Sequence, residues 1–280
     1  MDQELINQFI TSSLQEDVGD GDHTSLATVP AGTQGKAKLL VKDEGILAGV
    51  ELAEIIFHVV DPQLKLNIFI HDGAEVKPKD IAFEVAGSAH SILKAERLVL
   101  NCMQRMSGIA TRTHEIADLL EDTNTKILDT RKTTPGLRYF EKWAVRIGGG
   151  VNHRFGLYDM ILIKDNHVDY SGGIRQAIEN ARQYVAETKK LAIEIEVRNI
   201  DELEQVLQTG GVDRILLDNF TYADLREAVN MIEGRYITEA SGGITIDNVR
   251  DYAACGVDYV SMGALTHSIK SLDLSLKAVK

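Results

Sequence analysis

The chain has 280 residues, of which 44% are hydrophobic, and its formal net charge is −12 at pH 7. This length suits one large domain or two ordinary ones, and the acidic balance argues against a protein that binds nucleic acid along its whole surface. No apolar run approaches the roughly 18 residues of a membrane-spanning helix, and the acidic N-terminus lacks the positive region of a signal peptide. Cys102 and Cys255 are too few for a disulfide framework, so we expect reduced thiols and a cytoplasmic protein.

The first 110 residues are expected to form a small domain of helices and short strands. Apolar residues at positions 5, 6, 9 and 10 share one helical face and predict a helix near the N-terminus. Alternating segments at residues 36–41, 64–70 and 81–85, bounded by Gly, Pro or Asp, predict strands. A helical pattern at residues 93–106 is expected to continue past Gly108. We assign residues 1–110 to this domain.

A different rhythm begins after residue 120, where apolar strands alternate with amphipathic helices. The predicted strands lie at residues 126–130, 160–164, 191–197, 214–218, 236–240 and 258–262. This alternation predicts a parallel sheet. Six strand–helix units favour a β/α barrel with fewer than eight strands, and a doubly wound open sheet is the alternative. We assign residues 111–267 to this domain and leave open that residues 268–280 pack back on the first one.

Polar side chains occur where most of these strands end. They are Asp129 and Arg131, Lys164 and Asp165, Glu194 and Glu196, Asp218 and Asn219, and Glu239 and Ser241. The carboxyl ends of parallel strands gather at one edge of a β/α fold, which is the active side. The pattern therefore predicts a polar pocket at that edge.

Positive charge is concentrated in residues 131–164, which hold seven Lys or Arg residues and only two acids. The candidate ligand-binding cations follow strand ends or a run of three glycines: Arg131, Lys132, His153, Arg154 and Lys164. Arginine offers a planar fork to carboxylates, and lysine offers a mobile point charge. Several of them converging would suit a small, highly charged anion such as a dicarboxylate together with a phosphate.

The acids and glycines complete the predicted pocket. Glu196 and Asp218 end consecutive strands and could accept hydrogen bonds from ribose hydroxyls, hold Mg²⁺ through water, or stabilise an oxocarbenium ion. The alternative is a structural ion pair with a nearby lysine. Glu194 points to the same face as Glu196, and spacing alone does not rank the two. The glycine-rich turn after Ser241, and Gly263 after the last strand, predict a phosphate site.

Other conspicuous residues receive structural interpretations. Arg138, Lys142 and Arg146 recur at helical spacing, which favours a solvated or dimer-facing helix surface. The acidic loop at residues 17–22 lacks the closing glutamate of a calcium loop and is interpreted as a turn or cap. Five histidines are isolated and have no ligand spacing: His23, His58, His71, His90 and His114.

Six ordered motifs together resemble the quinolinate phosphoribosyltransferase family. They are DTRKT at residues 129–133, GGGVNHR at 148–154, IKDNH at 163–167, LLDN at 216–219, SGG at 241–243 and MGALTHS at 262–268. AER at residues 95–97, LN at 100–101 and SGIAT at 107–111 also match. The resemblance covers nearly the whole chain, from residue 16 onward. One departure is Ala240, where some relatives have serine, and we expect little effect from it.

The resemblance implies a fold and a reaction. The fold is an N-terminal α/β sandwich followed by an incomplete β/α barrel of about six parallel strands. The reaction converts quinolinate and phosphoribosyl pyrophosphate into nicotinate mononucleotide, pyrophosphate and CO₂, with Mg²⁺, in de novo NAD biosynthesis. Family members form homodimers or assemblies of dimers, in which each barrel faces the partner's N-terminal domain. Neither a nucleic acid nor a membrane partner is implied.

The resemblance also implies residue roles. Quinolinate binding is implied for Arg97, lent by the neighbouring subunit, and for Arg131, His153, Arg154 and Lys164. Lys132 lies between the two substrates and, with Glu196 and Asp218, is the implied catalytic set. The two acids lie near the ribose and the metal. The 5′-phosphate site is implied for Ser241, Gly242, Gly243 and Gly263, with His267 close by.

Three rival functions remain at the level of sequence. A paralogue associated with molybdate transport should lose parts of the dicarboxylate cluster, which is intact here. A nicotinate phosphoribosyltransferase would need fewer cations and no decarboxylation. A non-catalytic sensor of phosphate ligands would not require paired acids facing the cations. Turnover of quinolinate in the presence of phosphoribosyl pyrophosphate and Mg²⁺ separates all three from the favoured reading.

Overall fold

The computed structural model describes residues 3–279, and its contacts divide the chain into two compact units. Within those residues, the first unit runs up to His114, takes in Thr134–Gly149 and ends with the segment from Ile269 onward. The second unit comprises Glu115–Thr133 and Gly150–Ser268. Among the described helices, none is long and apolar enough to cross a bilayer.

The first unit is built on a four-stranded sheet in the order β12-β1-β5-β3. These strands are β1 (Gln34–Val41), β3 (Lys65–Ile68), β5 (Ile81–Ser88) and β12 (Leu274–Ala278), all antiparallel to their neighbours. A short pair, β2 (Gly45–Ile46) and β4 (Glu75–Val76), stands apart. Burial alternates along β1, so Leu39 and Val41 face the core. The chain's last strand therefore pairs with its first one.

Helices complete this unit. They are α1 (Gln3–Val18), α2 (His23–Thr28), α3 (Val50–Val60), most of α4 (Ala89–Leu119) and α5 (Arg138–Ile147). Phe57 of α3 meets Phe83 of β5 edge to face, with ring centroids 5.9 Å apart. The predicted strands and the long helix continuing past Gly108 are thus confirmed, although β3 is shorter than expected.

Helix α5 contradicts the expectation of a charged surface helix. Residues 140–145 are all buried, and Lys142 is only 2% exposed, whereas Arg146 is exposed. Phe140 contacts Phe9 of α1 with ring centroids 4.3 Å apart. The surface interpretation is therefore wrong for Lys142, because α5 packs within the first unit on more than one face.

The second unit is a sheet of six parallel strands in the order β6-β11-β10-β9-β8-β7. They are β6 (Lys126–Leu128), β7 (Ile161–Ile163), β8 (Ile193–Val197), β9 (Arg214–Asp218), β10 (Ile237–Ser241) and β11 (Tyr259–Ser261). All six predicted strands are present. Successive strands are neighbours, apart from β6 and β7, which end the sheet. This order belongs to a β/α barrel left open between those two strands and excludes the doubly wound alternative, in which strand order reverses within the sheet.

The opening beside β6 is partly filled by the loop that follows the glycine run. Val151 forms an isolated parallel bridge with Leu128. Its N–H donates to the Ile127 carbonyl at 2.9 Å, and the Asp129 N–H donates to its carbonyl at 3.2 Å. The residues just after Val151 are thereby carried to the carboxyl end of β6.

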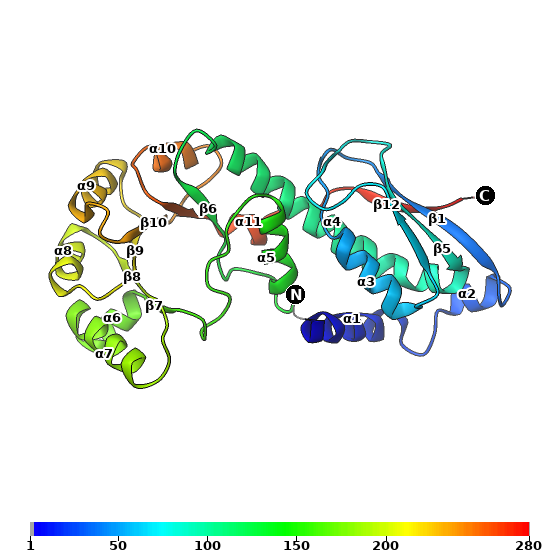
Figure 1. The fold of residues 1–280 in the computed structure, drawn as a ribbon, viewed down its shortest axis with the longest axis horizontal. Helices are drawn as coiled ribbons and strands as arrows, with labels where there is room; N and C mark the ends of the chain where they lie inside the picture. The colour runs from blue at the N-terminus through cyan, green and yellow to red at the C-terminus, as the bar shows by residue number, and fades with distance from the viewer. Residues whose placement is uncertain (1–2, 280) are drawn as a thin grey trace. The chain divides into compact units, whose positions relative to one another are not determined.

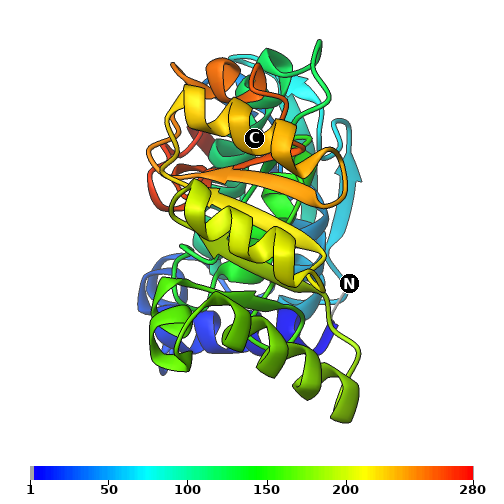
Figure 2. The ribbon, with the colours of Figure 1, turned by 90° about the vertical axis from the view of Figure 1, so that its left-hand side faces the viewer.

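Helices follow the strands of this unit (Figure 1). They are α6 (Asp165–Ser171), α7 (Ile174–Glu187), α8 (Ile200–Thr209), α9 (Tyr222–Ile232), α10 (Val249–Ala253) and α11 (Ala264–His267). Figure 2 shows α7, α8 and α9 side by side in front of the strands. Side-chain caps start two of them: Asn199 accepts the Glu202 N–H, and Thr221 accepts the Asp224 N–H. The carboxyl ends of the strands are left for the polar residues.

Candidate active site

A cavity of about 680 Å³ lies at the carboxyl ends of the six strands of the second unit. Its polar and glycine lining consists of Thr130, Arg131, Lys132, His153, Arg154, Lys164, Glu196, Asp218, Asn219, Glu239, Ser241, Gly242, Gly243, Thr245, Ser261, Gly263 and His267. Every residue to which the resemblance assigns a substrate role is in this lining, except Arg97, whereas the strand-end acids Asp129, Asp165 and Glu194 are not. Residues separated by up to 137 positions in the chain thus share one pocket.

Arg97 lies elsewhere in the structure. It is an exposed residue of α4 in the first unit, where it lines another cavity of about 580 Å³. Arg105 lines the same cavity and binds the buried Glu141, with 2.6 Å between Nη2 and Oε1. The structure of the single chain therefore does not place Arg97 among the cations of the second unit's pocket.

The cationic side of the pocket is held by a buried carboxylate. Asp129 is fully buried and accepts hydrogen bonds from the backbone N–H of His153 at 2.8 Å and from Asn152 Nδ2 at 2.6 Å. Burial and the positive charge of Arg131 lower the pKa of Arg154. Two guanidinium groups that repel each other across a pocket favour an anion between them, because it relieves the repulsion.

The acidic side faces these cations. Lys164 Nζ lies 2.6 Å from Glu196 Oε2, so the ion pair considered as an alternative for Glu196 exists and lies inside the pocket. Asp218 Oδ2 accepts a hydrogen bond from Asn219 Nδ2 at 2.7 Å. Burial and the neighbouring Glu196 raise the pKa of Asp218. A cation bound between the two carboxylates would reverse that effect.

The donor set of this acidic side fits Mg²⁺. The ion prefers oxygen ligands and is usually held by one or two carboxylates, several waters and substrate phosphates. Glu196 and Asp218 end neighbouring strands, and the repulsion between them leaves negative charge to be balanced. These are the residues that would hold the ion.

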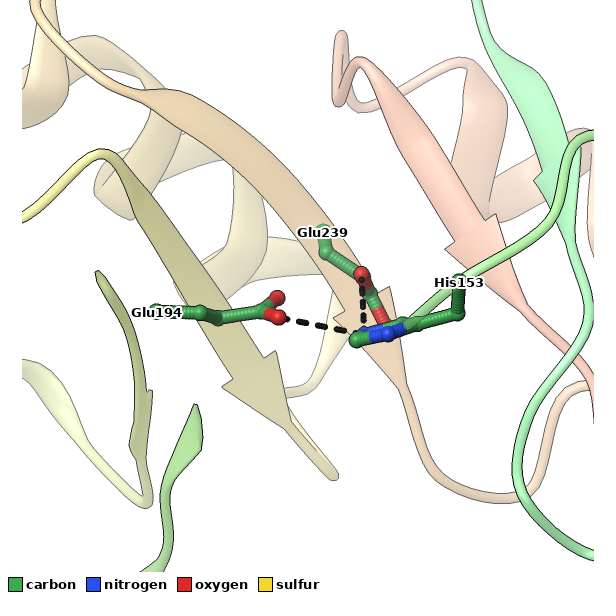
Figure 3. Close-up of side chains that lie close together, drawn as sticks. All are labelled: His153, Glu194 and Glu239. Carbon is green, nitrogen blue, oxygen red and sulfur yellow. Dashed lines mark ion pairs between the residues drawn. The ribbon is translucent and has the colours of Figure 1, made fainter. Parts of the chain in front are cut away.

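A cluster of charged residues is buried beside the pocket, and its two glutamates lie two positions before Glu196 and Ser241 (Figure 3). His153 Nε2 lies 3.1 Å from Glu194 Oε2 and 3.4 Å from Glu239 Oε2. Arg214 reaches Glu239 Oε2 at 3.1 Å, and its guanidinium carbon lies 4.8 Å from the Tyr259 ring centroid. Sequence analysis listed Glu239 among the polar strand ends without a specific role, and it did not point to Arg214. The sequence feature that could have identified these residues is a charged side chain at an inward position of an otherwise apolar strand.

The proton distribution in this cluster follows from its contacts. Burial disfavours a charged imidazole, but the carboxylates of Glu194 and Glu239, which can accept hydrogen bonds from Nε2, raise the pKa of His153. The backbone N–H of Arg154 donates to Nδ1 at 2.6 Å, so Nδ1 is an acceptor. Burial raises the pKa of Glu194.

Glycines shape the remaining wall of the pocket. Gly242 has φ +95°, and a Cβ there would lie 2.1 Å from Asn219 Oδ1. A Cβ on Gly263 would lie 2.8 Å from Cδ of Lys132. Thr266 Oγ1 donates to the Lys132 carbonyl at 2.8 Å and so fixes the loop that carries this lysine. Any larger residue at these two turns would therefore collide with a side chain of the pocket.

Models of two domains of a known protein family match this chain. The model of the quinolinate phosphoribosyl transferase C-terminal domain matches residues 109–277, and that of the N-terminal domain matches residues 22–107. The chain belongs to the quinolinate phosphoribosyltransferase family. The resemblance seen in the motifs and the predicted fold class are both confirmed.

Individual relatives of the family span most of the chain. Quinolinate phosphoribosyltransferase [decarboxylating] 1b of Nicotiana tabacum is 48% identical over 96% of this chain and 81% of its own length. A probable nicotinate-nucleotide pyrophosphorylase [carboxylating] of Bacillus subtilis is 42% identical over 98% of this chain and 92% of its own. The crystal structure of NadC from Streptococcus pyogenes matches with a TM-score of 0.93 and 38% identity, covering 100% of this chain and 99% of that one.

A more distant structure shares the fold alone. Human nicotinic acid phosphoribosyltransferase aligns with a TM-score of 0.63 at 10% identity, over 97% of this chain and 74% of that one. Because so little sequence is shared, this likeness carries no argument about substrate.

Proposed function

We propose that this chain transfers the phosphoribosyl group of phosphoribosyl pyrophosphate to quinolinate and releases pyrophosphate and CO₂, so that nicotinate mononucleotide is formed for NAD biosynthesis. One observation carries the proposal. A single pocket is lined by Arg131, Arg154 and Lys164 and by the two carboxylates Glu196 and Asp218. That arrangement suits a dianionic acceptor beside a sugar carbon that becomes positive. Membership of the family supports the same reaction.

Recognition of quinolinate is assigned to the cations. Its two carboxylates lie on adjacent ring carbons, so they require positive groups on one side of a flat ring. Arg131 and Arg154 supply guanidinium groups whose mutual repulsion an anion relieves. Lys164 is shared with Glu196, which limits how far its ammonium group can move. These contacts would hold the ring nitrogen in a fixed position, which is catalysis by orientation.

The phosphoribosyl pyrophosphate site is assigned to the acids and the glycine turns. Glu196 and Asp218 would accept hydrogen bonds from the ribose hydroxyls and stabilise positive charge on the anomeric carbon. Ser241 and the backbone around Gly242 and Gly263 would receive the 5′-phosphate. Mg²⁺, if bound at the two acids, would neutralise charge on the departing pyrophosphate. Lys132 lies between the two substrate regions, and His267 at the pocket rim stays a proposed phosphate neighbour.

The chemistry proceeds in two steps. The ring nitrogen of quinolinate forms a bond to the anomeric carbon while the bond to pyrophosphate breaks and its electron pair leaves with the pyrophosphate. The resulting pyridinium then draws electrons from the adjacent carboxylate. The carbon–carbon bond to that carboxylate breaks, CO₂ departs, and a proton from solvent replaces it on the ring. No dedicated base among the pocket residues is required for the loss of CO₂.

A direct assay tests this proposal. The purified chain is incubated with quinolinate, phosphoribosyl pyrophosphate and Mg²⁺, and both nicotinate mononucleotide and CO₂ are measured. We expect the two products in equal amounts, and no product when quinolinate is omitted. A parallel reaction with nicotinate as the acceptor addresses the nearest rival activity. Turnover with nicotinate alone, or failure to turn over quinolinate under any metal condition, would contradict the proposal.

We also propose that the enzyme is a homodimer with a shared active site. Arg97 is an exposed cation in the first unit, and the family resemblance implies that a neighbouring subunit inserts it. The cytoplasmic location likewise stays a proposal, which the two free thiols, Cys102 and Cys255, support. Fractionation of the source cells with an antibody against the chain tests the location, since recovery in a membrane-enclosed organelle would contradict it.

A further inference from the structure

Asp159 is one of only two acids in the cation-rich segment at residues 131–164. The other, Glu141, pairs with Arg105 in the first unit. Asp159 instead lies near a cation of the pocket, because burial lowers the pKa of Arg154 and the charge of Asp159 acts against this effect. A carboxylate in such a place repels a dianionic ligand. Its presence therefore indicates a role that outweighs this repulsion.

The carboxylate of Asp159 closes a turn that begins directly after Arg154. Its Oδ2 accepts the backbone N–H of Phe155 at 2.6 Å, and its Oδ1 accepts the backbone N–H of Gly156 at 2.9 Å. Burial opposes the charge of this carboxylate, but the two hydrogen bonds lower the pKa of Asp159. The backbone that follows Arg154 is thereby tied to the residue that stands shortly before β7.

The tip of this turn is not held by burial. Leu157 is 72% exposed and Tyr158 is 65% exposed. The Tyr158 carbonyl accepts a hydrogen bond from Lys189 Nζ at 3.4 Å, which is a long contact on the surface. The two shorter hydrogen bonds to Asp159 are therefore the main contacts that fix the shape of the turn.

The guanidinium of Arg154 depends on the same turn. Arg154 lines the pocket of about 680 Å³ and also a second cavity of about 320 Å³, which Leu157 and Met160 line as well. A side chain with open space on two sides is not fixed by close packing. Its Nη1 donates to the Met160 carbonyl at 3.2 Å, and Met160 follows Asp159 directly. Both the backbone and the side chain of Arg154 are thus held by the far end of one turn.

We propose that Asp159 is a positioning residue for quinolinate, which holds the backbone N–H groups of Phe155 and Gly156 and so fixes the turn that keeps the Arg154 guanidinium at the pocket wall. In this role Asp159 acts only through Arg154, and it is itself outside the pocket lining. The inference rests on the proposed function for its effect on quinolinate. The hydrogen bonds within the turn do not depend on that function.

A purely electrostatic role is the competing explanation. Asp159 would then serve only as a negative charge that offsets the repulsion between Arg131 and Arg154. The two explanations predict effects of opposite sign. Removal of a negative charge near the site should strengthen the binding of a dianion if charge alone matters. Loss of the turn should weaken that binding, because Arg154 is no longer held in place.

The first experiment compares Asp159 variants by steady-state kinetics. In Asp159→Ala both acceptors are lost, and we expect the KM for quinolinate to rise roughly tenfold, as for lost hydrogen bonds to a charged group, with the KM for phosphoribosyl pyrophosphate nearly unchanged. Asp159→Asn keeps one acceptor oxygen and should show a smaller rise. Asp122→Ala is the matched control for the change in charge, because the exposed Asp122 pairs with Arg250 and is outside the pocket lining.

Three kinetic outcomes would overturn the proposal. They are a lower KM for quinolinate in Asp159→Ala, an unchanged one, and an equal change for both substrates. A lower value in particular would identify Asp159 as a simple counter-charge.

The second experiment reads the turn directly and needs no turnover. Amide hydrogen exchange of the ¹⁵N-labelled chain is followed by NMR in the wild type and in the nearly isosteric Asp159→Asn. We expect the amides of Phe155 and Gly156 to exchange faster in the variant, by roughly tenfold at the site that loses its acceptor. The amide of Thr238, which donates to Asp258, should be unchanged. Equal exchange of the Phe155 and Gly156 amides in the two proteins would overturn the proposal.

The two proposals fail in different ways. If the wild-type chain forms no nicotinate mononucleotide, the proposed function falls, whereas amide exchange still decides whether Asp159 holds the turn. If the wild-type chain turns over and the KM for quinolinate does not rise in Asp159→Ala, the function stands and the positioning role falls.

Discussion

At the scale of single residues, the pocket divides into groups that touch a ligand and groups that hold those groups. Asp129 illustrates the second kind, because it is fully buried and anchors the loop of His153 through a backbone N–H. Thr266 does the same for the loop of Lys132. Positioning residues of this type bury polar atoms that would be costly without partners. Their hydrogen bonds offset that cost and fix the positions of the loops that line the pocket.

Arg131 carries the first residue-scale prediction. Arg131→Ala removes a guanidinium that repels Arg154 in the free enzyme and binds carboxylate in the complex. We expect kcat/KM for quinolinate to fall by the equivalent of about 2–4 kcal/mol, the range for a broken buried charge pair. Steady-state kinetics with varied quinolinate measures it. Arg146→Ala is the control, since Arg146 is exposed on α5, and wild-type kinetics in Arg131→Ala would refute the assigned role.

Gly242 is the subject of the second residue-scale prediction. Gly242→Ala places a methyl group 2.1 Å from Asn219 Oδ1 and also strains a backbone at φ +95°. The turn must shift, so we expect a higher KM for phosphoribosyl pyrophosphate and little change in quinolinate binding. Gly234→Ala is matched to it, because Gly234 has φ +69° and no atom within 4 Å of the added Cβ. If both variants behave alike, backbone strain rather than crowding of the pocket is responsible.

At the scale of elements, strand β12 shows how the end of the chain completes the first unit. It pairs with β1 over residues 274–278, and Gln104 Nε2 of α4 donates to the Leu274 carbonyl at 2.9 Å. Leu274 and Leu276 are buried against the core, while Lys277 is exposed. The strand thus pairs the backbone groups of β1 that would otherwise be exposed, and it becomes the edge strand of the sheet.

Leu276 provides the element-scale prediction. Leu276→Ala should lower the free energy of unfolding by about 2–5 kcal/mol, because a buried leucine leaves a cavity when it is truncated. Urea denaturation followed by circular dichroism measures this, with Lys277→Ala on the same strand as the control. The Lys277 variant should stay within about 0.5 kcal/mol of the wild type. Equal midpoints for the two variants would contradict the packing assigned to β12.

At the scale of the whole molecule, our proposal is that a second copy of the chain completes the active site. The pocket in the second unit contains all the predicted substrate-binding cations and acids except Arg97, which belongs to the first unit. If a sister subunit lends Arg97, each active site draws on two chains. Mutations at Arg97 and at Arg131 then damage the same site from different chains.

Mixing of inactive variants tests the shared site. Arg97→Ala and Arg131→Ala should each be inactive, and in a heterodimer one of the two sites carries both changes while the other carries neither. We expect partial recovery of activity, about a quarter of the wild-type value for random exchange of subunits, since half of the dimers are mixed and each has one intact site. Native mass spectrometry verifies the exchange. Verified heterodimers without activity would count against the shared site.

The order of strands and helices, the fold class and most members of the pocket could be predicted from the amino-acid sequence alone. Period-two and helical patterns are local, so the six strands of the barrel could be read directly, and parallel strands bring their carboxyl ends together by necessity. For the same reason Arg131, Lys164, Glu196 and Asp218 could be assigned to one pocket before any contact was known. The pairing of charges inside the pocket could be seen only in the folded structure.

The partners of Arg214 and the burial of Lys142 show why. Arg214 lies 25 residues from Glu239 and 45 from Tyr259. A charged residue that points inward from a strand does not reveal which neighbouring strand will supply its partner. Lys142 sits at a helical spacing typical of a surface, yet its helix packs within the first unit and buries it. Local periodicity specifies which face a side chain occupies. What covers that face depends on segments distant in the chain, and their placement is set by packing of the whole fold.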